Sequence, residues 1–272
     1  MTTTPSLALS PDRTLTTIDL WKTAALLLIL VDHLGFFIWV DQPWLTAVGR
    51  AALPVFFFLI GFARTRAVPW FWWVAGLLLT ALDGRRLAGE GLPELNIMFS
   101  FALIRLALPF VERHVFAAWW RVALFAAGAA ALMPLTGEWV EYGTEGLLLA
   151  LVGLAHRRAL ESGPDQPRAP AWLIRRSLGA FATLAFLAMQ IIDYDFTVAE
   201  TWVAAASVIV VSGLLLRFRN SNVRFRPPLV MAAVFRFCGR RSLEIYVAQI
   251  VGLMALGMAL GIDAADINGD DE

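Results

Sequence analysis

Residues 17–37 read TIDLWKTAALLLILVDHLGFF, an apolar stretch that is interrupted near its end by the adjacent pair Asp32 and His33. A helix crosses the hydrocarbon core of a bilayer with about 20 mostly apolar residues. The apolar run over 18–39 is too long for the central region of a secretory signal, and no small-residue cleavage site follows it. It therefore predicts a retained transmembrane helix.

The composition of the whole chain also indicates a bilayer as its solvent. Of the 272 residues, 59% are hydrophobic and only 16% are charged, whereas soluble domains carry about 25% charged residues. The 22 basic and 22 acidic residues cancel, so no net charge favours a nucleic-acid partner. One cysteine excludes a disulfide framework, and the scattered histidines offer no metal-ligand spacing. We therefore expect an all-α, polytopic membrane protein without a bound metal.

Apolar segments of similar length recur along the chain and predict about nine spans within one domain over 18–262. These spans lie at 18–39, 44–63, 67–82, 94–111, 115–136, 142–160, 171–192, 197–216 and 242–262. Residues 229–238 could form a tenth, partial span or an interfacial helix. The polar segment 1–17 and the acidic segment 263–272 are expected to be disordered tails.

The arginines predict the orientation, because cytoplasmic loops of membrane proteins collect Lys and Arg. Seventeen of the 22 basic residues fall on the same side as the N-terminus, and only Arg85 and Arg86 fall in loops on the other side. Those loops carry acids instead, at Asp41, Glu138, Glu141, Asp193 and Asp195. We expect a multi-pass protein of the inner (cytoplasmic) membrane, with its N-terminus inside and its C-terminus outside.

Ionisable side chains inside the spans cost about 2.5–3.5 kcal/mol each on insertion scales, so each needs a partner or a function. Counting from the span ends places several in one layer of the outer half: Asp32, His33, Arg50, Asn96, and Glu145 or Glu200. Adjacent helical residues point about 100° apart. We therefore expect Asp32 and His33 to serve different partners, one an ion pair with Arg50 and the other a cavity.

Structural explanations of the same residues stay open. The His–Asp–Arg group could simply link helices, and Asn96 could equally make an interhelical hydrogen bond. Glu145 and Glu200 could extend to the interface. The arginines on the inner face could reflect only topology and attraction to anionic lipids.

Two neighbouring segments resemble the TraX family of membrane proteins. Residues 17–37 contain a DHxG motif, and WLTAVGRAALPVFFFLIGF (44–62) contains GRxAxPxF. LNIMFSFALIRL (95–106) and YGTEGLLLALVG (142–153) are similar to later segments of that family. SLEIYVAQI (242–250) is similar to the SLxIYxxH ending of the acyltransferase family 3 proteins, except that Gln249 stands where those relatives often have His.

The resemblance implies an integral membrane acetyltransferase that takes acetyl groups from cytoplasmic acetyl-CoA. TraX proteins are known for acetylating the N-terminus of conjugative pilin, and relatives acylate sugars, so the acceptor stays open. By position, His33 would be the catalytic base or acyl carrier, with Asp32 and Arg50 beside it. A neutral imidazole both donates and accepts a hydrogen bond, which suits proton removal near pH 7.

Two further groups of residues complete the predicted site. Substrate contacts are expected from Asn96, Ser100, Glu145, Glu200 and Tyr246. Donor phosphates are expected at Arg105, Arg121, Arg236, Arg240 and Arg241, because arginine binds phosphate with two hydrogen bonds. The expected partners are the acyl acceptor and membrane lipids, and a homodimer is one candidate oligomeric state.

A proton-coupled transporter or flippase is the main alternative, because intramembrane acids, histidine and arginine also suit a proton relay. The sequence shows no inverted repeat, which many transporters contain. A non-enzymatic membrane scaffold is a third class, but it would not require polar residues at one depth.

Overall fold

The computed structural model describes residues 14–82, 94–161, 168–223 and 227–262. Five helical segments in these ranges are long and apolar enough to cross a membrane. They are α1 (Thr17–Phe37), the broken helix formed by α2 (Pro43–Gly49) and α3 (Ala52–Phe62), α10 (Arg168–Asp193), α11 (Val198–Leu215) and α13 (Ser242–Ala259). Over the described ranges the backbone forms helices and isolated bridges but no strands. The all-α class and the membrane assignment agree with this result.

The remaining helices are shorter or more polar. They are α4 (Trp70–Leu82), α6 (Ile97–Phe110) with a π-helical turn η2 (Val111–Val115), α7 (Trp119–Ala131), α8 (Met133–Gly137), α9 (Gly143–Glu161) and α12 (Leu229–Arg240). Thirteen residues of α7 rise only about 20 Å, less than the hydrocarbon thickness of about 30 Å. The count of nine spans therefore stays a prediction.

The start of α1 is fixed by local chemistry. Thr16 and Asp19 form a reciprocal capping box, in which the Asp19 carboxylate accepts from the Thr16 amide at 2.9 Å. Leu15 is buried, and the Thr17 amide donates to the Ser221 carbonyl at 3.0 Å. The last residues of the predicted N-terminal tail are thus packed against the fold. Residues 1–13 and the predicted tail 263–272 lie outside the described residues, as do Arg85 and Arg86.

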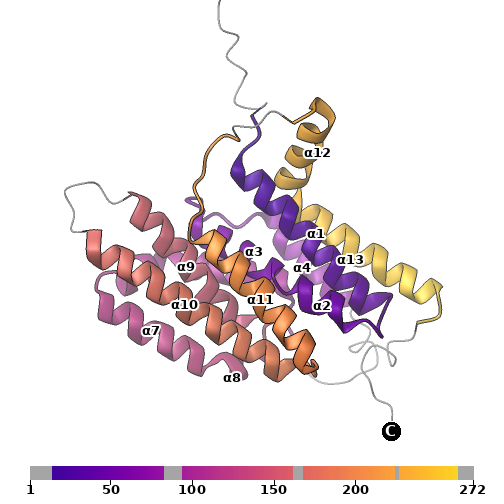
Figure 1. The fold of residues 1–272 in the computed structure, drawn as a ribbon, viewed down its shortest axis with the longest axis horizontal. Helices are drawn as coiled ribbons and strands as arrows, with labels where there is room; N and C mark the ends of the chain where they lie inside the picture. The colour runs from indigo at the N-terminus through magenta and orange to yellow at the C-terminus, as the bar shows by residue number, and fades with distance from the viewer. Residues whose placement is uncertain (1–13, 83–93, 162–167, 224–226, 263–272) are drawn as a thin grey trace, which may run out of the picture.

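The centre of the bundle is the close contact between α3 and α9. A methyl group at Gly61 would lie 1.8 Å from the Ala150 carbonyl oxygen, and one at Gly153 would lie 2.0 Å from that of Phe58. Only glycine permits this approach of the two backbones. Figure 1 shows α3 between a flank of α1 and α13 and a second flank of α7, α9 and α10. The packed core therefore surrounds α3.

Loops and the ends of helices gather at two opposite ends of the bundle. The Tyr142 end comprises 38–42, 94–96, 138–142 and 194–197, and the Glu112 end comprises 14–17, 63–66, 111–118, 157–161 and 217–223. At the Tyr142 end the Leu95 amide donates to the Trp139 carbonyl at 2.8 Å. At the Glu112 end Arg157 donates to the Ala63 carbonyl at 2.9 Å. The described Tyr142-end loops contain acids and no Lys or Arg, whereas arginines crowd the Glu112 end.

Candidate active site

Arg50 and Asp32 form a buried ion pair near the Tyr142 end. Arg50 lies at the break between α2 and α3, and its Nε donates to Asp32 Oδ1 at 3.0 Å while Nη2 pairs with Oδ2. Both residues are only 5% exposed. A methyl group at Gly49 would lie 2.3 Å from Asp32 Cβ, so glycine at this position lets α2 approach α1. Of the two adjacent residues Asp32 and His33, Asp32 is therefore the one that forms the expected ion pair with Arg50.

Two tyrosines complete the Arg50 environment. Nη1 of Arg50 donates to the hydroxyl oxygens of Tyr142 at 2.9 Å and Tyr194 at 2.8 Å. Tyr142 holds a φ of +58°, a left-handed conformation that costs a non-glycine residue about 1–3 kcal/mol. Because both hydroxyls accept from Arg50, their own O–H hydrogens can donate to an incoming ligand. Burial raises the pKa of Tyr194, although the charge of Arg50 opposes the rise, so this hydroxyl stays protonated.

His33 faces a different neighbour, as expected for a residue adjacent to Asp32. Its ring centroid lies 5.7 Å from that of Tyr246 on α13 and 5.8 Å from that of Phe37. Its Nδ1 is buried and has no hydrogen-bond partner among the described residues. Nε2 of Gln249, one turn beyond Tyr246, is also buried and unpartnered. Two polar groups of the α1–α13 side are thus left with unused hydrogen-bonding capacity, which is uncommon for buried atoms.

Asn96 and Ser100 make hydrogen bonds that connect α6 to the neighbouring segments. Asn96 caps α6 by accepting from the Met98 amide, and its Nδ2 donates to the Gly76 carbonyl on α4 at 2.7 Å. Ser100 donates to the backbone carbonyl of Glu141. The structure therefore gives Asn96 the interhelical role that was one of its two predicted readings.

Glu141 is the acid that those contacts hold in place. Its Oε2 accepts from the Ile97 amide at 2.7 Å. Burial raises the pKa of Glu141 to about 7, and nearby carboxylates add to the rise, while the Ile97 amide and Arg50 oppose it. This carboxyl group therefore changes charge near neutral pH.

Glu145 and Glu200 have partners of their own. Glu145 is buried and accepts from Gln190 Nε2 of α10 at 3.0 Å. Glu200 accepts from the backbone amide and hydroxyl of Thr197 and closes the capping box of α11. Neither makes a hydrogen bond to Arg50 or His33 among the described contacts. In the structure Glu145 thus connects α9 to α10, and Glu200 caps the N-terminus of α11.

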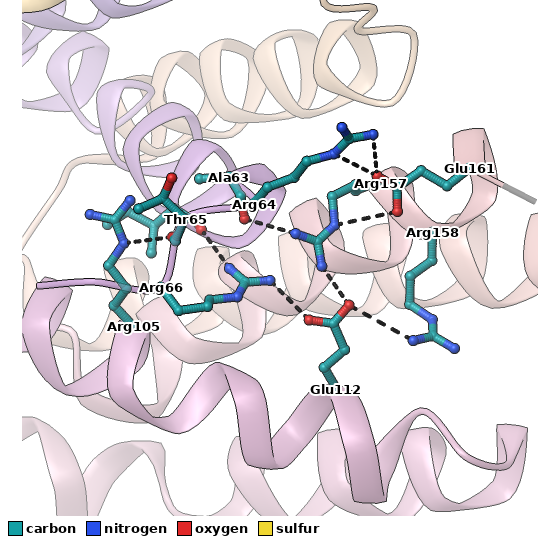
Figure 2. Close-up of polar contacts among 10 residues, drawn as sticks. Ala63, Arg64, Thr65, Arg66, Arg105, Glu112, Arg157, Arg158 and Glu161 are labelled. Carbon is teal, nitrogen blue, oxygen red and sulfur yellow. Dashed lines mark hydrogen bonds and ion pairs between the residues drawn. The ribbon is translucent and has the colours of Figure 1, made fainter.

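The Glu112 end carries a dense arginine cluster, which Figure 2 shows. Glu112 pairs with Arg66 Nη2 at 3.2 Å and with Arg157 Nη2 at 2.5 Å, and Arg158 Nη1 lies 3.9 Å away. Arg64 pairs with Glu161 at 2.8 Å. Burial opposes ionisation of Glu112, but the two close arginines outweigh it and lower its pKa. With five arginines against two glutamates, including Arg105 in Figure 2, this cluster favours anions.

A cavity of about 240 Å³ opens beside this cluster, between α1, α3, α4, α6 and α13. Its described lining is apolar except for Ser242 and two cations, Lys22 and Arg105. Arg105 donates to the Thr65 carbonyl at 3.1 Å and lies 4.9 Å from the ring centroid of Trp72. Lys22 and His33 are eleven residues apart on α1, which is about three turns and 16 Å, so they share one face. The cavity thus lies about three turns of α1 from His33, towards the Glu112 end and along the same face of the helix.

The five predicted donor arginines do not form one cluster. Arg105 joins the cavity, whereas Arg121 donates to the His114 carbonyl at 3.3 Å and stacks over Trp120. Arg236, Arg240 and Arg241 belong to α12 and its junction with α13, where Arg241 pairs with Glu244 at 3.6 Å. Lys22, Arg66 and Arg157 were not predicted as anion-binding residues.

Three further members of the site, Tyr142, Tyr194 and Glu141, were not predicted from the sequence. One signal was available, because the chain contains only three tyrosines. Two of them bind Arg50, and the third, Tyr246, lies against His33. All three tyrosines of the chain thus contact Arg50 or His33, which indicates a shared role at this site.

Comparison with known proteins finds relatives of a single family. Two curated relatives, both called Protein TraX, come from Escherichia coli and from Escherichia coli strain K12. They are 32% and 31% identical over 148 and 147 residues, which cover 52% and 51% of this chain and 56% and 55% of the relatives. The aligned part thus spans about half the length of those relatives, and no solved structure matches the chain. The family model described as TraX protein matches residues 17–204, more than half of the chain, and contains Asp32, His33 and Arg50. The chain therefore belongs to the TraX family.

Proposed function

We propose that this protein is an acetyl-CoA-dependent acetyltransferase of the inner membrane, with nine spans, a cytoplasmic N-terminus and a relationship to acyltransferase family 3. Acetyl-CoA binds at the Glu112 end, and an amine or hydroxyl acceptor, such as a protein N-terminus or a sugar, reaches the Tyr142 end. One observation carries the proposal: buried His33, whose Nδ1 has no hydrogen-bond partner among the described residues, directly follows the Arg50-bound Asp32 in the chain and lies against Tyr246. It shares a face of α1 with Lys22, which lines the cationic cavity.

The Glu112 end suits a donor that carries phosphates. Arginines of the cluster around Glu112 exceed its acids, and guanidinium groups bind phosphate with paired hydrogen bonds. Arg105 belongs both to this cluster and to the cavity lining. A thioester arm entering the cavity from the phosphate site would follow α1 from Lys22 towards His33. Buried Leu26 and Ile29 lie between these two residues, so the arm must displace side chains to reach the imidazole.

The residues near Arg50 suit acyl transfer. As the acceptor nitrogen or oxygen attacks the thioester carbon, its proton passes to His33. The carbonyl oxygen gains negative charge, which the hydroxyls of Tyr142 and Tyr194 can stabilise by donating hydrogen bonds. The carbon–sulfur bond then breaks, and the CoA thiolate takes the proton back from His33. Arg50 already uses four of its five N–H donors on described partners, so it positions the tyrosines.

Donor binding tests the proposal first. The purified protein should gain thermal stability when millimolar CoA is added, because a ligand of the folded state stabilises it by mass action. Arg105→Gln should reduce this shift, whereas the matched change Arg219→Gln, at an exposed residue outside the cavity, should retain it. An absent shift in the wild-type protein contradicts the donor assignment.

Release of the CoA thiol distinguishes the acetyltransferase proposal from the transporter alternative. Acetyl-CoA with a primary amine, the protein and a thiol reagent should yield free CoA and acetylated amine in equal amounts. The buried ionisable residues Asp32, Arg50 and Glu145 also suit a proton relay. Proton-coupled flux in liposomes without any thiol release would therefore favour the transporter.

A further inference from the structure

The helix α12 is too short to cross a bilayer. Its 12 residues rise about 18 Å, compared with a hydrocarbon thickness of about 30 Å. The helix ends at Arg240, and the next residue, Arg241, has a φ of −109° and a ψ of 25°, which break the path into α13. Figure 1 shows α12 beside the first turns of α1 and directed away from the course of α13. It is therefore a separate element at the Glu112 end.

One face of α12 is seated on the beginning of α1. Ala232 and Gly239 are buried, and a methyl group at Gly239 would lie 2.5 Å from the Asp19 Cα. Thr23 donates to the Phe235 carbonyl at 3.3 Å. These contacts fix the helix against the bundle and decide which face points away from it.

The outward face is apolar and uncovered by the described residues. Val230 is 77% exposed, Val234 51% and Phe237 62%, and their spacing of four and three residues places them in one stripe. Leu229, at the start of the helix, is 89% exposed. Contiguous apolar surface of this kind indicates a docking site.

Arginines line one edge of the stripe. Arg236 and Arg240 are four residues apart and therefore share an edge of the helix, and Arg241 follows directly. No acid occurs between Leu229 and Arg241. An apolar stripe with a basic edge has the pattern of helices that lie in the plane of a membrane surface and bind anionic lipids.

We propose that α12 is an interfacial anchor that binds anionic phospholipids of the leaflet at the Glu112 end. The stripe of Val230, Val234 and Phe237 enters the boundary between headgroups and acyl chains, and Arg236 and Arg240 contact lipid phosphates. A second copy of the chain fits less well in an antiparallel two-fold contact through this stripe, because that contact would bring the arginine edges of both copies together. This inference does not depend on the acetyltransferase proposal.

The depth of α12 can be measured with single-cysteine proteins, since Cys238 is the only cysteine in the chain. In a Cys238→Ser background, Val234→Cys and Phe237→Cys carry a fluorophore, and Asn220→Cys is the exposed control at the same end. In nanodiscs of phosphatidylcholine and phosphatidylglycerol, lipids with a quencher high on the acyl chain should quench labels at 234 and 237 several-fold more than at 220. Labels at 234 and 237 that respond like the control to a water-soluble quencher would overturn the proposal.

Lipid charge is tested by neutralising the arginine edge. Quenching at 234 should be stronger in nanodiscs with phosphatidylglycerol than in phosphatidylcholine alone. Arg236→Gln with Arg240→Gln should abolish this difference, whereas the equal charge change Arg217→Gln with Arg219→Gln should retain it. Equal quenching in both lipids, or an equal loss in the control, contradicts a role for anionic lipid. Energy transfer between α12 labels on two copies, without lipid quenching, would instead assign the stripe to a dimer.

Discussion

Arg50, at the break between α2 and α3, binds both carboxylate oxygens of Asp32 on α1, at a depth where each residue is only 5% exposed. Removing one member of a buried pair leaves the other charge uncompensated, which costs about 3–5 kcal/mol. We expect Asp32→Asn to lower the free energy of unfolding by this amount. Asp32→Leu combined with Arg50→Met should cost less than Asp32→Asn, because no lone charge remains. Denaturant unfolding in detergent measures both, and a double variant that is less stable than the single one would contradict this account.

His33→Gln should lower acetyl transfer by about a hundredfold or more while the fold persists, since glutamine retains hydrogen bonding but cannot accept a proton near pH 7. The matched control is His114→Gln, which removes an imidazole at the opposite end of the bundle. Acetyl-CoA consumption, thermal melts and size-exclusion profiles should be compared for all three proteins. Near wild-type turnover in a folded His33 variant would end the catalytic assignment.

Glu141 predicts a pH dependence of stability near neutrality. Its folded pKa of about 7 is above the ordinary value of 4.5, so the folded state binds the proton more tightly than the unfolded state. The free energy of unfolding should therefore fall as pH rises from about 4.5 to 7. Glu141→Gln should flatten this slope, and Glu138→Gln, at an exposed position in the same loop, should leave it unchanged. Thermal melts across this range test the prediction, and equal slopes in wild type and Glu141→Gln would refute it.

Gly153→Ala should destabilise the contact between α3 and α9. The added methyl group would lie 2.0 Å from the Phe58 carbonyl oxygen, so one backbone must move, and overpacking costs about 1–3 kcal/mol. Gly128→Ala on α7 is the control, because nothing lies within 4 Å of its new methyl group. It should be neutral or stabilise the helix by up to about 1 kcal/mol. A similar melting temperature for both variants would show that the helices separate without cost.

Reporter fusions test the predicted orientation. A reporter placed after residue 140 and one at the C-terminus should both signal from the outer compartment, whereas one after Arg64 should signal from the cytoplasm. These sites follow from the excess of basic residues at the Glu112 end. A cytoplasmic signal at the C-terminus would mean either that residues 229–238 cross the membrane as a further span or that one of the nine predicted spans does not.

The sequence by itself determined that this protein lies in a bilayer, and it placed Asp32 and Arg50 at the same depth. Hydropathy is a sum over neighbouring residues, so the bilayer assignment and the apolar segments containing Asp32 and Arg50 needed no tertiary information. A helix rises 1.5 Å per residue, so the depth of each polar side chain also follows from the span that contains it. That count placed Asp32 and Arg50 in one layer, where the structure joins them.

Only the tertiary structure decided which residues surround that pair. Depth follows from the sequence, but the direction in which a side chain points around the bundle depends on how helices pack. Tyr142 and Tyr194 lie in connections between helices, where no periodicity predicts their position, and they reach Arg50 across 92 and 144 residues of sequence. Glu200 was placed at the correct end of its helix, yet local capping by Thr197 takes up its carboxylate. The sequence therefore determines the layer of each polar group, whereas packing decides its partners.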